Sequence, residues 1–207
     1  MRRMGWFCGV LLFTLAGCIR TPPPQPPIVV NPAPMPAMSL TCSVVGTMPG
    51  WAPTAVDGLS VRTGDSIQFQ LTVNPAANVY LLHIGSSGSG TALLPQSAGA
   101  DANIMLMANV PTLAPVAGRI RVAPPAGEER LIFVASQLRV PEIDALVGRG
   151  KLSGSDIDRA VAQAAARNAP DYRMTKTVGY GNRVDFQAFT AYPYPILIAD
   201  VTMHHLP

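Results

Sequence analysis

An alternating stretch in the first half of the chain most strongly limits how it can fold. Ile67, Phe69, Leu71 and Val73 are apolar, and the positions between them carry Gln, Gln and Thr. This period of two puts all four apolar side chains on one face of a β-strand. The preceding Gly64-Asp65 pair is typical of a turn. The sequence therefore predicts a strand with one buried face and one face toward water.

A second strand follows closely. Residues 74–77 contain Pro75 and predict a turn, and residues 78–84 (NVYLLHI) are almost continuously apolar. A run of this kind is typical of a central strand. The Gly- and Ser-rich residues 85–90 form the predicted connection, and residues 91–94 form the second strand, which runs back along the first. The pair predicts a hairpin whose loop is longer than the tightest two-residue turns.

Other β-prone segments extend this pattern over most of the chain. Residues rich in Pro and Gly, such as 124–127 (PPAG), separate them. The predicted strands are residues 39–45, 101–110, 118–122, 129–136, 183–191 and 195–203. Many short strands joined by turns are typical of a β-sandwich.

One segment has helical periodicity instead. Ser155 is the expected N-cap, and Asp156 in the first turn suits the helix dipole. Asn168 and Pro170 end the helix. Its apolar stripe consists of Ile157, Val161, Ala164 and Ala165. The small side chains predict close packing, so the expected fold is mainly β: a β-sandwich-like domain with one C-terminal α-helix packed on it, preceded by a Pro-rich tether.

The N-terminus has the layout of an export signal. Arg2 and Arg3 form a positive start, and the uncharged, mostly apolar run 5–15 is too short to cross a bilayer as a helix. The run ends in Leu15, Ala16, Gly17 and Cys18. This ending resembles the bacterial lipobox.

The lipobox resemblance implies that residues 1–17 are a signal peptide and that Cys18 is acylated. Two or more acyl chains give stable anchoring in a membrane. In that family an Asp after the Cys tends to retain the protein in the inner membrane, whereas this chain has Ile19. The resemblance therefore implies an outer-membrane lipoprotein, with its domain expected in the periplasm.

A tether, residues 18–38, connects the acylated Cys18 to the domain at residues 39–207. Residues 19–38 contain eight prolines. Proline lacks a backbone N–H, so the run cannot form a ladder and favours polyproline II. Twenty such residues reach on the order of 60 Å. A spacer is favoured over a ligand for aromatic grooves.

Charge and cysteine content exclude two classes of protein. Removing Arg2 and Arg3 reduces 15 Lys and Arg residues to 13, against 12 Asp and Glu, so no basic patch predicts nucleic-acid binding. With Cys18 acylated, Cys42 has no intrachain partner, which excludes a disulfide framework. Cys42 is expected to be a small buried residue and not a reactive thiol.

The order of motifs in the predicted domain resembles a known family. Residues 61–71 (VRTGDSIQFQL) combine a Gly-Asp turn with an alternating strand, and residues 78–82 (NVYLL) form a Tyr-containing strand. Residues 93–95 (LLP) follow, and residues 127–136 (GEERLIFVAS) place a Gly-Glu turn before an apolar strand. With the C-terminal helix and strand, these motifs resemble the DUF-4384 family over roughly residues 55–205.

This resemblance implies an all-β, sandwich-like domain of secreted or envelope proteins. The chain departs from the family pattern at Gly85-Ser86, where an Asp-Gly turn is usual. The family has no established activity, so it assigns no catalytic residue to this chain.

The candidate chemical groups are few. His83 lies in an apolar strand, where a structural role is favoured over catalysis. His204 and His205 are neighbours and would point to opposite faces of a strand, so they are poor ligands for one metal ion. Glu128 and Glu129 are placed in a turn. The sequence predicts neither a metal site nor a cofactor.

Tyrosines provide the candidate interaction surface. Tyr172, Tyr180, Tyr192 and Tyr194 gather after the predicted helix among Pro and Gly residues. The sequence allows two roles for these tyrosines, packing in the core or forming an exposed recognition surface, since aromatic residues serve either purpose.

Function is predicted from these features together. The first hypothesis is a non-enzymatic interaction or scaffold module, attached to the membrane through acyl chains on Cys18 and docking on a larger outer-membrane or secretion-type protein assembly. The alternative is a periplasmic binder of a small ligand or glycan. An envelope hydrolase is less favoured because no catalytic set is evident.

Overall fold

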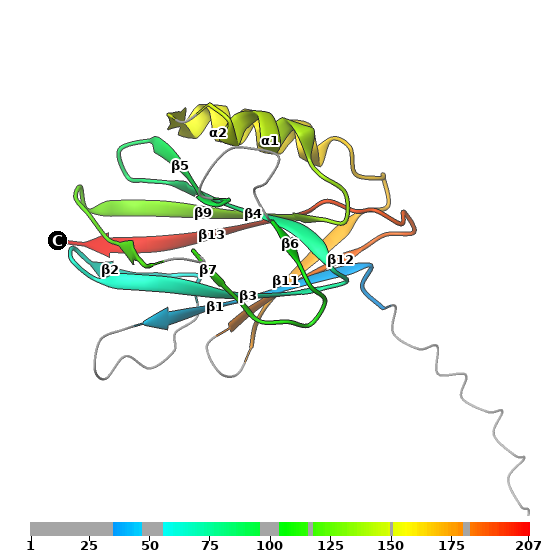
Figure 1. The fold of residues 1–207 in the computed structure, drawn as a ribbon, viewed down its shortest axis with the longest axis horizontal. Coiled ribbons are helices and arrows are strands. Elements are labelled where there is room, and N and C mark those ends of the chain that lie inside the picture. Colours follow the sequence, from blue (N-terminus) through cyan, green and yellow to red (C-terminus); the bar gives the residue numbers. More distant parts are fainter. Residues whose placement is uncertain (1–34, 47–55, 96–103, 116–117, 150, 180–182) are drawn as a thin grey trace, which may run out of the picture. The chain divides into compact units, whose positions relative to one another are not determined.

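A computed structural model describes residues 35–46, 56–95, 104–115, 118–149, 151–179 and 183–207. The described part is mainly β, with two sheets packed face to face and two helices outside one of them (Figure 1). This confirms the predicted fold class. The predicted signal peptide and the predicted tether up to position 34 lie outside the described residues.

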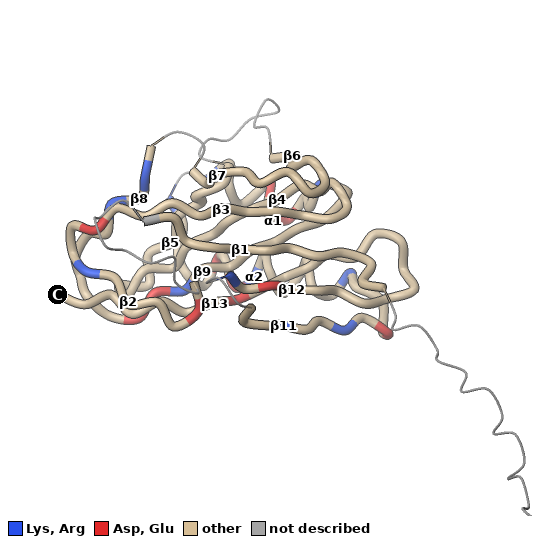
Figure 2. The backbone as a smooth tube through the Cα atoms, turned by 90° about the horizontal axis from the view of Figure 1, so that it is seen from below, with Lys and Arg blue, Asp and Glu red and all other residues tan. Residues whose placement is uncertain are grey.

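The two sheets bring together strands that are distant in the sequence. The first contains, in order, β11 (Arg173–Gly179), β12 (Arg183–Phe189), β1 (Met38–Gly46), β3 (Ser66–Asn74) and β7 (Thr112–Ala114), with β8 (Ile120–Arg121) also pairing with β3. The second contains, in order, β10 (Leu152–Ser153), β5 (Ser89–Leu94), β4 (Ala77–Ile84), β9 (Gly127–Ser136), β13 (Leu197–Leu206) and β2 (Leu59–Arg62), with β6 (Met105–Leu106) also pairing with β4. Figure 2 shows the first sheet from its outer side. Among these strand pairs, only β13 and β2 are parallel.

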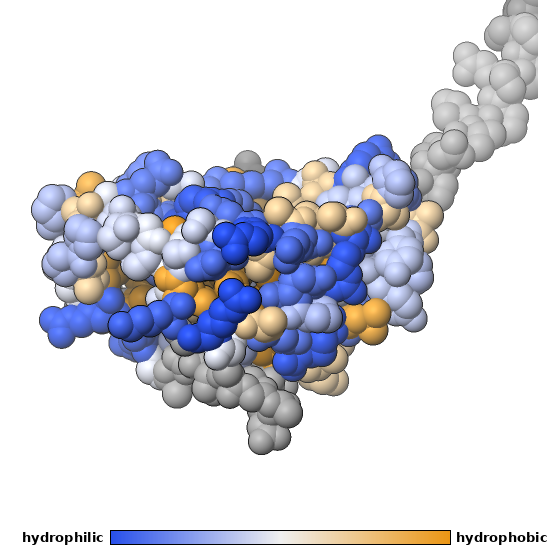
Figure 3. Space-filling model, turned by 90° about the horizontal axis from the view of Figure 1, so that it is seen from above, coloured by the Kyte–Doolittle hydropathy of each residue, from blue (hydrophilic) through white to orange (hydrophobic). Residues whose placement is uncertain are grey.

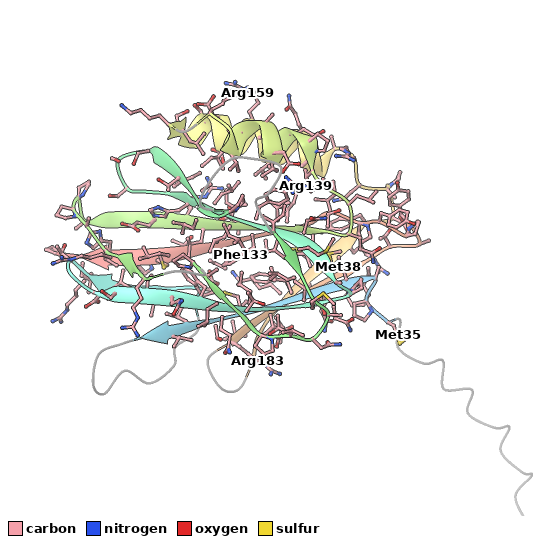
Figure 4. All side chains as sticks on the ribbon, in the orientation of Figure 1. Met35, Met38, Phe133, Arg139, Arg159 and Arg183 are labelled. Carbon is pink, nitrogen blue, oxygen red and sulfur yellow. The ribbon has the colours of Figure 1, made fainter. Side chains whose placement is uncertain are left out.

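The alternation in β3 has the predicted result. Ile67, Phe69, Leu71 and Val73 are each at most 1% exposed, and they face the second sheet. Phe69 meets Phe133 of β9 edge to face, with ring centroids 6.2 Å apart. Figure 4 places Phe133 between the two sheets. Cys42 of β1 is also buried there, and burial raises the pKa of its thiol, which confirms the expectation of a small buried residue.

Strand β4 is central, as predicted, and lies between β5 and β9. Its residues are buried on both faces because each face has a cover. Val79 and Leu81 pack between the sheets, whereas Tyr80 and Leu82 pack under the helices. Strands β4 and β5 form the predicted hairpin, but β5 begins at Ser89, so the connection is residues 85–88 and not the predicted 85–90.

The outer face of the second sheet is covered by α1 (Pro141–Val147) and α2 (Gly154–Ala165). Figure 1 shows both helices on this side, and Figure 3 shows that their outward surface is mostly hydrophilic. The sequence predicted only α2. Helix α1 has seven residues and begins at Pro141, where the missing proline N–H is harmless.

The predicted N-cap of α2 is wrong by two residues. Ser153, not Ser155, caps the helix: its side chain accepts from the backbone N–H of Asp156, and the Asp156 carboxylate accepts from the Ser153 N–H. This reciprocal pair is a capping box in which Asp replaces the usual Glu. Ser155 is one residue inside the helix.

Glycine permits the close approach of α2 to the sheet. A Cβ atom on Gly90 of β5 would lie 2.7 Å from the Ile157 side chain, and one on Gly154 would lie 2.9 Å from Ile84. Both distances are too short for real side chains. Within the Gly-rich residues 85–90, Gly90 is therefore needed for packing against α2, and the segment is more than a connection between strands.

Four of the described strands were missing from the sequence-based prediction: β2, β7, β10 and β11. Strands β7 and β10 have only three and two residues. Strand β2 has four residues, too few for a clear period. Strand β11 is exposed on nearly every residue, so its apolar pattern is weak. It lies at the edge of its sheet, and Lys176 on it pairs with Asp57. In the predicted strand 101–110, the structure describes residues 104–110, and only β6 is a strand there.

Candidate functional site

Three titratable side chains meet on the inner face of the second sheet. The Glu129 carboxylate is the centre: its Oε2 atom lies 3.0 Å from His83 Nε2, and its Oε1 atom lies 3.0 Å from His205 Nδ1. Glu129 is buried, and the side chain of His205 is fully buried. Buried carboxylates need such partners because desolvation penalises an isolated charge. The cluster therefore satisfies both carboxylate oxygens.

The cluster continues to a surface hydroxyl. His205 Nε2 lies 2.8 Å from Thr63 Oγ1. In the tautomer with the proton on Nδ1, this ring N–H donates to Glu129, and Nε2 accepts from the Thr63 hydroxyl. The result is a chain of hydrogen bonds from exposed Thr63, through His205 and Glu129, to His83.

Strand periodicity places these groups. His205 points into the sandwich and His204 outward, as expected for neighbours on a strand. Glu128 and Glu129 both lie in β9, so the predicted turn at these positions is wrong, whereas the predicted strand 129–136 correctly contains Glu129. Glu129 shares the inner face with Leu131 and Phe133. The alternation of this predicted strand already places the Glu129 carboxylate on the face of Leu131.

A cavity of about 240 Å³ lies beside the cluster, between the two sheets. His83 and Glu129 form part of its wall. The other lining residues are mostly apolar and come from β3, β5, β8, β9, β13 and the residues after β8: Ile67, Phe69, Thr91, Leu93, Ile120, Arg121, Val122, Ala123, Leu131 and Met203. Arg121 is exposed, and no acidic side chain among the described residues pairs with it.

The order hydroxyl, imidazole, carboxylate is that of an acyl-transfer triad. Such chemistry also needs free backbone N–H groups to stabilise an oxyanion. Next to the Thr63 hydroxyl, the N–H groups of Thr63, Gly64 and Asp65 donate to the carbonyl oxygens of Leu206, Val122 and Arg62. These three donors are therefore occupied. They do not form an oxyanion hole beside this hydroxyl.

The described residues contain no group of three or more His, Cys, Asp and Glu side chains that could hold a metal ion. In the Glu129 cluster each His directs a ring nitrogen at a carboxylate oxygen, so these atoms bond to each other. They do not surround a common empty point.

A second polar network lies on the opposite face of β4. The Tyr80 hydroxyl donates to Asp144 Oδ1 at 2.9 Å and accepts from the Val140 N–H at 3.2 Å. Arg139 donates to both Asp144 oxygens. Burial raises the pKa of Tyr80 to about 12, and the bond to Asp144 adds to this, whereas the Val140 N–H opposes it. The network fastens α1 to the sheet.

The structure separates the four candidate tyrosines. Tyr192 and Tyr194 are 46% and 44% exposed and form an edge-to-face pair with ring centroids 6.3 Å apart. Tyr172 is half-buried against the core between the sheets, and burial raises its pKa. Tyr180 lies outside the described residues. Only Tyr192 and Tyr194 are therefore brought together among those described.

The segment that carries Tyr192 and Tyr194 is fixed at both ends. The Asn168 side chain bonds to both the N–H and the carbonyl oxygen of Ile196, each at 2.8 Å. Asp171 accepts from the Ala191 N–H and the Thr190 hydroxyl. These bonds lower the pKa of Asp171. Two exposed aromatic rings are thus held on a well-anchored backbone.

The tyrosine pair borders a small hollow. Leu138, which is 50% exposed, lines it with Arg167, Ser136 and Ile196. Tyr, Arg and exposed Leu side chains around one point are typical of a protein-binding surface, because aromatic and Arg residues are enriched at interfaces. We call Leu138, Arg167, Tyr192 and Tyr194 the tyrosine surface.

The residues predicted to form a lipobox, Leu15 to Cys18, lie outside the described residues. Among the helices of the described part, none has the length and apolar character needed to span a membrane.

One family model matches part of the chain. The model of DUF4384, a domain of unknown function, matches residues 60–139. This confirms the resemblance inferred from the motifs over that range, which runs from β2 through β9 and includes His83 and Glu129 but not His205. No curated protein matches the chain. No solved structure matches it either.

Proposed function

We propose that this chain is a lipid-anchored protein of the bacterial cell envelope whose sandwich domain is a non-enzymatic interaction module. The single observation that carries the module is the tyrosine surface. Tyr192 and Tyr194 are almost half-exposed, yet their backbone is held by Asn168 and Asp171. Rigid exposed aromatic residues bind with little loss of conformational entropy, which favours affinity.

The anchor and the tether complete the proposal. The motif from Leu15 to Cys18 supports acylation, and the eight prolines of residues 19–38 support a stiff spacer between the lipid and the domain. The domain would then meet a large envelope assembly at a distance from the membrane surface. The occupied backbone donors beside Thr63 support a non-enzymatic role.

Site-specific crosslinking in living cells tests the docking surface. A photoreactive amino acid replaces Leu138, next to the tyrosines, and in a control protein it replaces His204, which is exposed near the opposite end of β13. The proposal predicts one discrete crosslinked protein from position 138 and none from position 204. Tyr192→Ala in the first protein should remove the crosslink while the melting temperature changes little. Equal crosslinking from both positions would contradict a defined surface.

Fractionation tests the anchor separately. Cys18→Ser should move the protein from the outer-membrane fraction to the soluble fraction, because the acyl chains are the attachment. If the Cys18→Ser protein still sediments with the outer membrane, the lipobox interpretation is wrong.

A further inference from the structure

We propose that the cavity beside His83 and Glu129 binds a small organic molecule with an apolar body and one free carboxylate group. The cavity is separate from the tyrosine surface, and the two lie toward opposite ends of β13. The proposal therefore does not depend on the interaction module.

The size of the cavity limits the ligand. Its volume of about 240 Å³ equals roughly eight water molecules at about 30 Å³ each. A molecule of about ten non-hydrogen atoms, part of it in the mouth, fits this space. Large glycans and peptides do not, so the ligand is a small molecule.

The walls determine the chemistry of the body. Ile67, Phe69, Leu131 and Met203 are buried and line the inner part of the cavity. Apolar walls of this kind favour an aliphatic or aromatic group, because its transfer from water is favourable in proportion to the area buried.

The mouth determines the chemistry of the head. Arg121 and Ala123 line the cavity and are exposed, which places them on its solvent side. Figure 2 marks the basic position on β8. A guanidinium without an acidic partner among the described residues is suited to a carboxylate, which it can bind through two N–H groups.

His83 forms part of the cavity wall. Its ring is partly exposed, and Nε2 lies 3.0 Å from Glu129 Oε2. When Nε2–H donates to Glu129, Nδ1 is an acceptor and cannot donate to a ligand carboxylate, so the guanidinium of Arg121 provides the donors for the head group. Each oxygen of Glu129 has a histidine ring nitrogen 3.0 Å away.

Calorimetry with octanoate tests the proposal. The protein is the mature chain from residue 18 carrying Cys18→Ser, which keeps every described residue and removes the acylation site. Octanol is the uncharged probe with the same chain length. We expect saturable one-to-one binding of octanoate, tighter than that of octanol. Arg121→Gln should weaken octanoate binding about five- to tenfold, a typical effect of one charge-assisted contact at a solvent-exposed mouth, and leave octanol unchanged.

Two further variants locate the site. Arg119→Gln is the matched control, because Arg119 is exposed on the same segment and does not line the cavity; it should change neither affinity. Ala123→Trp narrows the mouth from an exposed position and should abolish binding of both probes. Circular dichroism and melting temperature confirm that each variant is folded.

The proposal is overturned by any of three results. No octanoate binding at millimolar concentration removes the site. Binding that survives Ala123→Trp places it elsewhere. Equal octanoate affinity in the Arg121→Gln protein and the unmodified sequence shows an apolar cavity that does not recognise a carboxylate.

Discussion

Two buried polar networks lie on opposite faces of the same strand, and they are built differently. Tyr80 and Val140 form a closed network with Asp144 and Arg139 under helix α1. Three residues further along β4, His83 begins an open network through Glu129 to His205. The open network ends at an exposed hydroxyl on one side and at a cavity on the other.

The difference teaches how to separate structural from functional polar groups in this fold. In the closed network the Tyr80 hydroxyl uses its donor and its acceptor, and the outcome is a fixed helix. In the open network His83 keeps one ring nitrogen without a partner among the described residues and lines a cavity that exposed Arg121 also lines. Both networks contain buried groups, so burial alone does not distinguish them. The distinguishing feature is that the open network lines a cavity.

The largest expected effect concerns Phe69, a buried core residue that also lines the cavity beside the open network. Phe69→Ala should lower the free energy of unfolding by about 3–5 kcal/mol, because it removes a buried ring in contact with Phe133. Gln70→Ala on the exposed face of β3 should change it by about 0.5 kcal/mol or less. Urea denaturation gives both values. Equal midpoints would contradict the register of β3.

The next effect tests whether the open network also contributes to stability. Glu129→Ala should cost about 2–4 kcal/mol, because it leaves the N–H donors of His83 and fully buried His205 without their acceptor. Glu128→Ala is the matched control from the exposed face of β9, with an expected change of about 0.5 kcal/mol or less. If both variants unfold at the same denaturant concentration, the cluster does not help to hold β4, β9 and β13 together.

A smaller effect is expected from the closed network. Tyr80→Phe removes the hydroxyl that bridges Val140 and Asp144 and should cost about 1–2 kcal/mol. Tyr192→Phe removes an exposed hydroxyl and is the control, with an unchanged denaturation midpoint. A stable Tyr80→Phe protein with unchanged exchange of the α1 amides would show that α1 does not depend on this contact.

The closed network also predicts a pH dependence. Folding raises the pKa of Tyr80 from about 10 to about 12, chiefly through burial, so the unfolded chain loses this proton first. The contribution to stability is therefore complete below about pH 10 and is lost as the pH rises toward about 12. Denaturation midpoints at about pH 9 and about pH 11 should differ less in Tyr80→Phe than in the unmodified chain. An equal difference in both proteins would assign the loss to other groups.

The sequence predicted the parts of the fold that depend on local periodicity. Strand β3 alternates because water lies on one side only, and β4 is continuously apolar because helices cover one face and a sheet the other. Helix α1 was missed because seven residues hold too little periodicity, and β11 because an exposed edge strand has no apolar face.

The candidate site depends on long-range geometry that the sequence does not contain. His83, Glu129 and His205 come from three strands, and the sequence predicts only a separate local role for each: a structural His83, a Glu129 in a turn, and a His205 that is a poor metal ligand beside His204. Their meeting follows from the order β4, β9, β13 and from the register that pairs Glu129 with Met203. The tyrosines are similar: sequence proximity grouped four of them, but the fold places Tyr172 against the core.

The smallest expected effect on stability concerns the tyrosine surface, and it extends the contrast between the two networks. If exposure and not burial marks the binding surface, its removal should cost the fold little. Tyr192→Ala and Tyr194→Ala should each lower the free energy of unfolding by about 0.5–1 kcal/mol, mainly through loss of the edge-to-face contact in half-exposed rings. The double variant should cost less than the sum of the single variants, because the first substitution already removes the shared contact. Asn168→Ala is the informative comparison, because it removes both bonds to Ile196 while the rings remain. It should lower the free energy of unfolding by about 1–3 kcal/mol.

Urea denaturation of the four variant proteins measures these changes in the free energy of unfolding. A loss above about 3 kcal/mol in either single Tyr variant would mean that the rings hold the end of the sandwich together, and the tyrosine surface would then be structural.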